Sequence, residues 1–280
     1  MSASQWISPA GLRSAVDLLG LLAHGELAVN GRLAVASNAT FIGHVAHGEQ
    51  RVTCVYKPIT GERPLWDFPD GSLAAREVAS YLVSEAAGWH VVPPTVLRTD
   101  GPAGAGMCQV WLEQPGTPGW VDVVAPDDVP SGTIPVLEGI DGDGSPVVLV
   151  HADRPELRRL ALFDVVINNA DRKGGHILTG DRGVAEHMAT IVGIDHGVSC
   201  HAEPKLRTVL WGWAGTALDA AERDELERIR AMLGGELGSQ LAELLTETEL
   251  IAMDERVSAL LQDGRMPVPE GRMPVPWPPF

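Results

Sequence analysis

The polar segment at residues 168–176 holds the densest group of side chains able to do chemistry. Asp171, Lys173 and His176 follow one another there at intervals of two and three residues. Asp171 could accept or orient the proton of an attacking hydroxyl, and Lys173 could neutralise charge on a transferring phosphoryl group. His176 stands five residues after Asp171, where a kinase catalytic loop carries its metal-binding Asn. The alternative interpretation is a helix-to-strand turn that simply uses Asp, Asn and Gly.

A second carboxylate follows at the end of a short apolar run. Residues 191–194 read Ile-Val-Gly-Ile, and Asp195-His-Gly comes directly after them. A strand that ends in Asp-x-Gly matches the position of a kinase metal-binding aspartate, and the glycine lets the backbone turn sharply. Asp-x-Gly alone is a common turn, so its weight comes from the preceding Asp171 segment. Together the two segments predict a divalent metal, Mg²⁺ or Mn²⁺, held by His176 and Asp195.

A third group combines a lysine with a glutamate. Only three of the 21 basic residues are lysines, which suggests that a surviving lysine marks a need for a compact ammonium. Lys57 ends an alternating apolar run, and Glu77 lies twenty residues later within a helical pattern. Kinase folds use such a strand lysine and helix glutamate to fix an ammonium against nucleotide phosphates. A surface lysine and a solvated helix glutamate are the alternative.

The first part of the chain contains the elements that must position Lys57 and Glu77. A helix is predicted at 14–22, and a second one follows the capping residue Ser72 and ends at Gly88. Five runs have the alternating or apolar pattern of strands: 31–35, 40–45, 51–57, 95–98 and 107–112. These elements predict an antiparallel sheet with one main helix, forming an N-lobe at residues 1–113.

The second part of the chain must position the two acidic segments. Residues 114–153 are rich in Pro, Gly and Asp, with one expected hairpin around Asp141. Pro155 suits the first turn of a helix reaching Asn168. Short strands at 176–178 and 190–194 and a helical remainder at 218–261 complete a C-lobe at 114–263.

The Pro-rich tail at 264–280 repeats Gly-Arg-Met-Pro-Val-Pro, which favours an extended polyproline-like segment that could dock a protein partner.

Two stretches resemble a known family. Residues 168–178 (NNADRKGGHIL) followed by 193–197 (GIDHG) are similar to the catalytic and metal-binding loops of phosphatidylinositol 3-/4-kinase-related proteins, including their bacterial relatives. Those enzymes carry Asp-Arg in place of His-Arg-Asp. Residues 74–95 resemble the helix and following strand of the same branch, which implies an ion-pair role for Glu77. The resemblance covers about residues 31–197.

This resemblance implies an α+β, two-lobed protein-kinase-like fold that binds ATP between a small antiparallel-sheet N-lobe and a mainly helical C-lobe. It also implies cofactor-binding positions. Residues similar to the phosphate-covering loop are Ser37, Asn38, Ala39 and Thr40, and the adenine would lie near Val110, Leu112 and Glu113. His176 departs from the family pattern, because Mg²⁺ prefers oxygen ligands and imidazole suits softer metals such as Mn²⁺. Use of Mn²⁺, phosphate binding by His176 with an Asn as the ligand, or lost activity would each explain it.

Composition restricts the partners. The net charge of −16 disfavours nucleic acid and anionic membranes, because both are bound chiefly through Lys and Arg. No apolar run has the length needed to span a bilayer. Three widely separated cysteines, Cys54, Cys108 and Cys200, fit a reducing compartment, so a cytoplasmic location is expected.

Three functions follow from these patterns. The first is an ATP-dependent phosphotransferase of the phosphatidylinositol 3-/4-kinase-like type, with an unknown acceptor among proteins, small molecules and lipids. The second is a pseudokinase, a nucleotide-binding regulatory protein without turnover, which the histidine at position 176 favours. The third is a metal-dependent hydrolase that uses His176 and Asp195, although a second histidine ligand is missing.

Overall fold

The computed structural model describes residues 15–33, 38–114, 116, 119–269, 271 and 273–280. Its first sheet has five strands in the order β1-β2-β3-β5-β4, and each neighbouring pair is antiparallel. The strands are β1 (Glu26–Arg32), β2 (Phe41–His47), β3 (Gln50–Pro58), β4 (Thr95–Arg98) and β5 (Gly106–Val110). Five strands were predicted for this part of the chain, and the structure confirms the number and the antiparallel pairing.

Strand β1 differs from its predicted position at 31–35. It begins at Glu26 and contains Asn30-Gly31, a dipeptide that normally marks a turn. A register shift between Val29 and Gly31 absorbs this dipeptide within the pairing to β2. The Asn30-Gly31 dipeptide therefore forms a bulge and not a turn, because β2 continues to pair with β1 beyond it.

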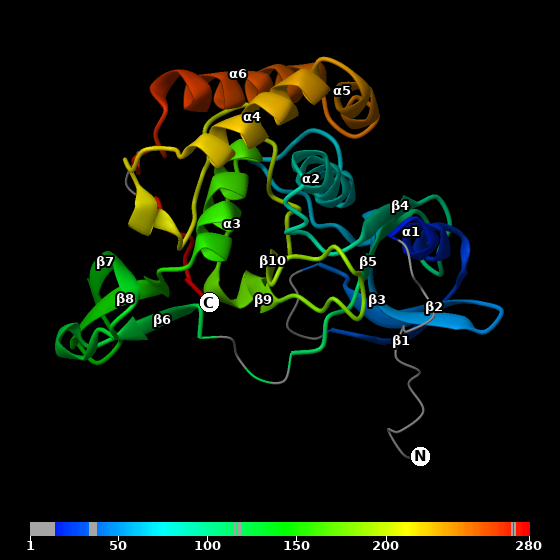
Figure 1. Cartoon of the computed structure of the whole chain (residues 1–280). Helices are drawn as coiled ribbons and strands as arrows, with labels where there is room; N and C mark the ends of the chain where they lie inside the picture. Colours follow the sequence, from blue (N-terminus) through cyan, green and yellow to red (C-terminus); the bar gives the residue numbers. More distant parts are fainter. Residues whose placement is uncertain (1–14, 34–37, 115, 117–118, 270, 272) are drawn as a thin grey trace.

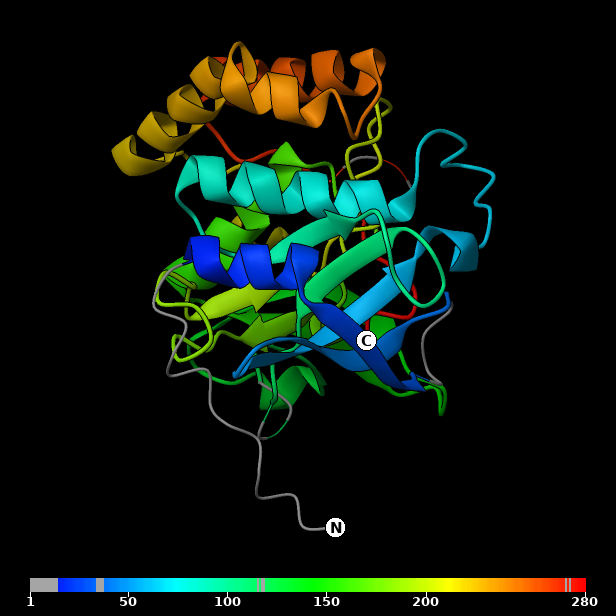
Figure 2. The same cartoon turned by 90° about the vertical axis from the view of Figure 1, so that its right-hand side faces the viewer.

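Two helices pack on this sheet, α1 (Ala15–His24) and α2 (Leu73–Ala87). The ends of α2 follow the sequence prediction: the Ser72 hydroxyl accepts a hydrogen bond from Ala75 N, and Gly88 adopts a left-handed φ of 71°. Helix α2 lies between the sheet and the C-terminal helices (Figures 1 and 2), so it is buried on several sides. Burial on several sides carries even its polar residues Arg76 and Glu77 into the interior.

A second antiparallel sheet occupies the region predicted to be mostly loop. It consists of β6 (Val121–Val124), β7 (Thr133–Ile140) and β8 (Pro146–Ala152), in the order β6-β8-β7. The hairpin expected around Asp141 is confirmed, since Asp141 and Ser145 close the turn between β7 and β8. Strand β6 was not predicted, because its four residues include only one buried side chain, that of Val121.

The remaining elements form the helical part of the molecule. Helix α3 (Pro155–Val166) begins at Pro155 as predicted, and the strands β9 (Ile177–Thr179) and β10 (Ile191–Gly193) form an antiparallel pair. The last helices are α4 (Ala220–Leu233), α5 (Glu236–Leu241) and α6 (Glu247–Asp263). Capping boxes at Asp219 and Thr246 fix the starts of α4 and α6. The main hydrophobic core surrounds the buried helix α3.

These elements confirm the α+β class with antiparallel sheets. A buried ion pair of 2.6 Å between Arg76 and Glu249 ties α2 to α6, and so joins the region of the five-stranded sheet to the C-terminal helices. Cys54, Cys108 and Cys200 are buried free thiols. Within the described ranges, no helix has both the length and the apolar character that crossing a membrane requires.

Candidate active site

Lys57 meets two carboxylates that come from different parts of the chain. Strand β3 presents its ammonium Nζ 2.6 Å from Glu77 Oε1 of α2 and 2.7 Å from Asp195 Oδ1, just beyond β10. The Glu77 side chain is 1% exposed, whereas that of Asp195 is 51% exposed. The lysine therefore joins one carboxylate in the interior to another that faces solvent.

The charges of this group stabilise one another. Burial lowers the pKa of Lys57, but the carboxylates of Asp195 and Glu77 outweigh it and raise that pKa above its usual value. The Lys57 ammonium in turn lowers the pKa of Asp195 well below its usual range. Burial raises the pKa of Glu77, although Lys57 opposes this effect. At neutral pH, Lys57 and Asp195 are therefore both charged.

The backbone around Asp195 is held in an uncommon conformation. Asp195 has a φ of 63°, in the left-handed region that non-glycine residues seldom adopt. The following amide, His196 N, donates a hydrogen bond to Glu77 Oε2 at 2.8 Å. Glu77 thus binds the lysine with one oxygen and the segment after β10 with the other, and this second bond helps to hold the turn.

His176 presents a nitrogen lone pair toward Asp195. Its Nδ1 lies 2.9 Å from the carbonyl oxygen of Asp171, so Nδ1 carries the proton and donates it. Burial lowers the pKa of His176 and favours the neutral ring. Nε2 is then unprotonated and lies 3.5 Å from Asp195 Oδ2. A neutral imidazole nitrogen beside a carboxylate oxygen is a donor pair that fits a divalent metal, and imidazole favours Mn²⁺ over Mg²⁺.

Asp171 and Lys173 lie beside this pair. Lys173 Nζ is 3.4 Å from Asp171 Oδ2, and both side chains are partly exposed. Burial raises the pKa of Asp171, while Lys173 and His176 oppose the shift. A carboxylate with a raised pKa can accept a proton more readily than a free aspartate can.

A buried arginine, Arg172, connects the Asp171 loop to the segment that carries Asp195. Arg172 is completely buried and bonds both oxygens of Asp164, the nearer at 2.9 Å. Its Nη1 donates to the carbonyl oxygens of His176 and Ile194, at 3.3 and 3.0 Å. One guanidinium therefore fixes the spacing between the Asp171 loop and the segment that carries Asp195.

Two neighbours complete this buried network. His196 Nε2 lies 2.6 Å from Arg172 Nη2 and accepts a hydrogen bond from it, since burial lowers the pKa of His196 well below its usual value and keeps the ring neutral. Gly193 passes directly under the guanidinium, and an added Cβ there would lie 2.6 Å from Arg172 Nη2. No role was predicted from the sequence for Asp164, Arg172 or Gly193. The available signal was a single aspartate inside the apolar run of α3.

The residues predicted to cover phosphates lie beside the loop that follows β3. Ser37 falls outside the described residues. Asn38 Oδ1 accepts from Arg63 N at 2.9 Å, Ala39 N donates to Gly61 O at 3.1 Å, and Thr40 is buried. Asn38 and Ala39 are therefore held against residues 61–63, whereas the Thr40 carbonyl oxygen accepts from Leu33 N at 2.8 Å.

The residues predicted to lie near an adenine differ in exposure. Val110 and Leu112 are buried in a hydrophobic cluster that includes residues of α1 and of the five-stranded sheet. Glu113 is exposed. The side chains of Val110 and Leu112 are therefore occupied with core packing.

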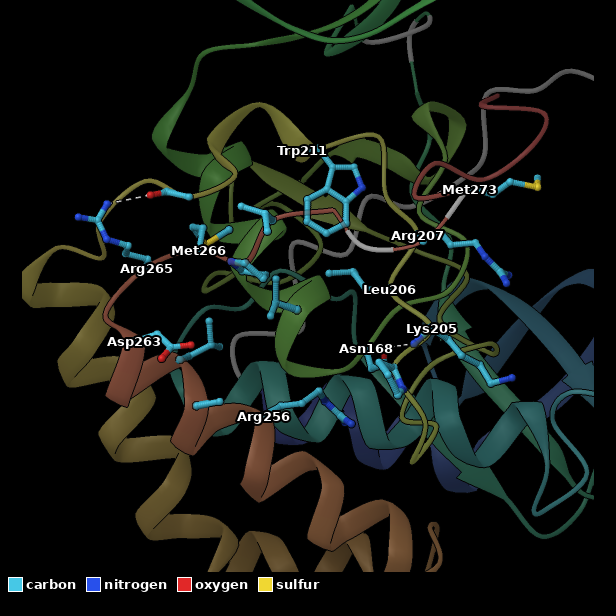
Figure 3. Close-up of a pocket in the computed structure, with 18 residues that line it drawn as sticks. Asn168, Lys205, Leu206, Arg207, Trp211, Arg256, Asp263, Arg265, Met266 and Met273 are labelled. Carbon is cyan, nitrogen blue, oxygen red and sulfur yellow. Dashed lines mark hydrogen bonds between the residues drawn. The ribbon is translucent and has the colours of Figure 1, made fainter.

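A large cavity lies elsewhere, between α6, residues 204–207 and the C-terminal tail (Figure 3). Its volume is about 1230 Å³, and its lining includes Trp211 and Met266 but none of Lys57, Asp171 or Asp195. Arg265 projects to the left in Figure 3, whereas Lys205 and Arg207 project to the right. The cationic groups are thus spread around this cavity and do not converge on one point.

The described residues contain no cluster of three or more His, Cys, Asp or Glu side chains placed to hold a metal. His176 and Asp195 form only a pair, and structural or hydrolytic zinc sites use three or four protein ligands. A metal at this pair would need further ligands from a bound phosphate compound, as Mg²⁺ and Mn²⁺ commonly do.

The fold and site together define an α+β protein in which a sheet lysine, a helix glutamate and two loop aspartates converge. No family model matches this chain. The chain is 49% identical over 273 residues to protein Rv2133c of Mycobacterium tuberculosis, with 94% of this chain and 96% of that protein covered. It therefore belongs to the same family as protein Rv2133c.

Among solved structures, the crystal structure of the Golgi casein kinase aligns with 89% of this chain and 74% of its own. The sequence identity is 12% and the TM-score is 0.49. A similarity at this level does not establish the fold or the function of this chain.

Proposed function

We propose that this protein is an ATP-dependent phosphotransferase with a kinase-like site of the phosphatidylinositol 3-/4-kinase-related type. The observation that carries the proposal is the contact of Lys57 with both Glu77 and Asp195, at 2.6 and 2.7 Å. Phosphoryl transfer needs an ammonium for the nucleotide phosphates and a nearby carboxylate for a metal. These two groups occupy one place here, although 138 residues separate them in sequence.

Each group has a role in this proposal. Glu77 orients the ammonium of Lys57 toward the α- and β-phosphates of ATP. His176 and Asp195 hold Mn²⁺ or Mg²⁺, which supplies positive charge to the phosphates when bound. Asp171 accepts or orients the proton of the acceptor hydroxyl, and Lys173 neutralises charge on the transferring group. Because catalysis of this kind is mainly positioning and electrostatics, the buried network around Arg172 supports it directly.

The proposal also assigns a place to the nucleotide. Residues 1–113 and 114–263 form the two lobes, and ATP binds between them. Residues 37–40 cover the phosphates, and the adenine lies near the main chain of residues 110–113, since the side chains of Val110 and Leu112 are buried. The acidic composition supports an acceptor other than nucleic acid. The buried free cysteines fit a cytoplasmic location.

A second candidate is a pseudokinase that binds nucleotide without turnover. It is favoured by His176, because an imidazole replaces the oxygen ligand expected in a magnesium-dependent kinase. Asp171 separates the two functions, because it acts in transfer and not in binding the nucleotide.

The test compares nucleotide binding and phosphoryl transfer in the wild type and in Asp171→Ala. An active kinase transfers the γ-phosphate with Mn²⁺ or Mg²⁺, and Asp171→Ala lowers the rate at least about a hundredfold while nucleotide-induced thermal stabilisation persists. Asp127→Ala, an exposed aspartate in the turn between β6 and β7, is the matched control and leaves both properties unchanged. Binding without transfer in the wild type would favour the pseudokinase.

A further inference from the structure

The C-terminal tail packs against the body of this protein. Its first part is pinned near α6, where Gly215 N donates to Met266 O and Met266 N donates to Thr216 O, at 3.0 and 2.9 Å. Its second part returns to the body at Pro274, whose carbonyl oxygen accepts from Thr208 N and from Trp211 Nε1, at 3.0 and 2.8 Å. Between these two points the tail borders the cavity of Figure 3. Up to Pro274, the tail is thus attached to the body at two places.

The end of the tail reaches the Asp171 loop. Gly174 N donates a hydrogen bond to Pro279 O at 2.8 Å, and the Phe280 ring lies against the same glycine. An added Cβ on Gly174 would lie 2.5 Å from Phe280 Cε1 and 3.3 Å from Val121 Cβ. Figure 1 shows the end of the chain beside β9, the strand that follows this loop. The tail therefore makes one main-chain hydrogen bond with the loop and packs one aromatic ring against it.

A middle segment links the tail to the other half of the loop. Arg172 N donates to Arg207 O, and Val209 N donates to Arg172 O, at 3.0 and 3.1 Å. Arg207 N donates to Asn169 O at 2.9 Å. Residues 207–209 therefore contact the loop on one edge, while Thr208 contacts Pro274 of the tail on the other.

The apolar residues of the tail support a structural role for this packing. Met266 and Val275 are 5% and 8% exposed and belong to the main hydrophobic core. They occupy different positions in the two copies of the repeat, Met in the first and Val in the second. The two copies of the repeat thus bury different side chains in the core, as expected when each copy packs against a different part of the body.

We infer that residues 274–280 are a positioning segment for the Asp171 loop, an inference that rests on the proposed phosphotransferase function. The loop carries Asp171 and Lys173 just before Gly174, and His176 just after it. Without Pro279 O, the Gly174 amide loses its hydrogen-bond partner. The loop then becomes more flexible at Gly174, between Lys173 and His176. The segment touches neither Lys57 nor Asp195 in any described contact. It should therefore affect the rate of phosphoryl transfer but not the affinity for the nucleotide.

The test uses the full chain and a form that lacks residues 277–280. Removal of these four residues leaves the buried Val275 and Pro276 in place. It should lower kcat at least about tenfold, keep the KM for ATP within about twofold, and speed hydrogen exchange in the peptide that covers residues 171–176. Unchanged kcat together with unchanged exchange would overturn the inference.

Two substitutions sharpen the test without shortening the chain. Gly174→Ala forces its new methyl group against Phe280 and should lower kcat. Adding Phe280→Ala removes this clash and should restore part of the loss, giving a positive coupling in the double-mutant cycle. Met273→Ala is the matched control, since this side chain lies just outside the positioning segment, is 62% exposed and should leave kcat unchanged. Strictly additive effects of the Gly174 and Phe280 changes would contradict the contact.

The outcomes also separate this inference from the proposed function. If ATP with Mn²⁺ or Mg²⁺ fails to stabilise the wild type, the proposed function fails, and hydrogen exchange then decides the positioning claim alone. Faster exchange at residues 171–176 in the truncated form supports the claim, and equal exchange refutes it. If ATP stabilises both forms equally and only the truncated form loses turnover, both proposals are supported.

Discussion

The two sides of the candidate site are built in different ways. Lys57 lies on β3, which is paired on both edges with β2 and β5, and Glu77 lies on α2, whose two ends are capped by the adjacent residues Ser72 and Gly88. Asp171 and Asp195 lie on irregular segments that depend on a buried arginine and on the C-terminal tail. We therefore expect the side with Lys57 and Glu77, the proposed phosphate-binding side, to tolerate local changes. The side with Asp171 and Asp195, the proposed catalytic side, should fail when a distant support is removed.

Removal of Arg172 should have the largest effect. Arg172→Ala leaves the Asp164 carboxylate buried without its cation, which costs about 3–5 kcal/mol of the free energy of unfolding. The catalytic side should lose its order first, because the carbonyl oxygens of His176 and Ile194 lose their shared donor. Urea unfolding measures this cost, and hydrogen exchange should rise at residues 171–197 more than in α2. A cost below about 1 kcal/mol would contradict the role assigned to Arg172.

A methyl group at Gly193 tests the same network with a smaller change. Gly193→Ala places its Cβ against a guanidinium that is fully buried and cannot move aside, so a cost of about 1–3 kcal/mol is expected. Gly20→Ala is the matched control: this helical glycine has open space around its Cβ position. The control should be neutral or stabilise the protein by up to about 1 kcal/mol. Equal effects of the two substitutions would remove the support for close packing under Arg172.

The pH dependence of stability tests the ion pair that joins the two sides. The pKa of Asp195 is depressed in the folded protein, chiefly by Lys57, so its contribution is complete above the unfolded pKa near 4 and is lost as the pH falls below it. Burial raises the pKa of Glu77, which acts in the opposite sense. The comparison of the wild type with Asp195→Asn isolates Asp195. Their difference in unfolding free energy should shrink below about pH 4, and a difference that stays constant from pH 7 to pH 3 would contradict the account.

A change of metal preference is the smallest expected effect. His176→Asn replaces the imidazole nitrogen by an amide oxygen, so activity with Mg²⁺ should rise relative to Mn²⁺ by several fold. His187→Asn, a change in the exposed loop between β9 and β10, serves as the control. Initial rates at saturating ATP with each metal give the ratio. An unchanged ratio would show that His176 is not a metal ligand.

Much of the regular framework could be predicted from the sequence. The start and end of α2 follow from Ser72 and Gly88, and the alternating pattern before Lys57 predicts the strand that carries it. Such features depend on neighbours in sequence, which is why local patterns predict them. The pairing of Lys57 with Glu77 followed from the resemblance to a kinase family, and the site roles of these residues stay predictions.

The supports of the catalytic side could not be predicted in the same way. Arg172 was considered only as part of a loop motif, because its burial depends on α3 and on Gly193, which lie at some distance along the chain. The tail was expected to be an extended polyproline-like segment that could dock a partner, since a Pro-rich repeat has no internal hydrogen bonds. Its packing on residues 208–216 depends on acceptors and donors that only the folded chain brings together.

The thermal stabilisation of the wild type by ATP with Mn²⁺, compared with that of Lys57→Met and Asp195→Asn, tests the claim that both groups bind one triphosphate. ATP at a hundred times its dissociation constant should add about 2.7 kcal/mol to the stability of the wild type. Each substitution should remove most of this gain, because the ammonium and the carboxylate act on the same triphosphate. Full stabilisation of both variants, or none of the wild type, would contradict the claim.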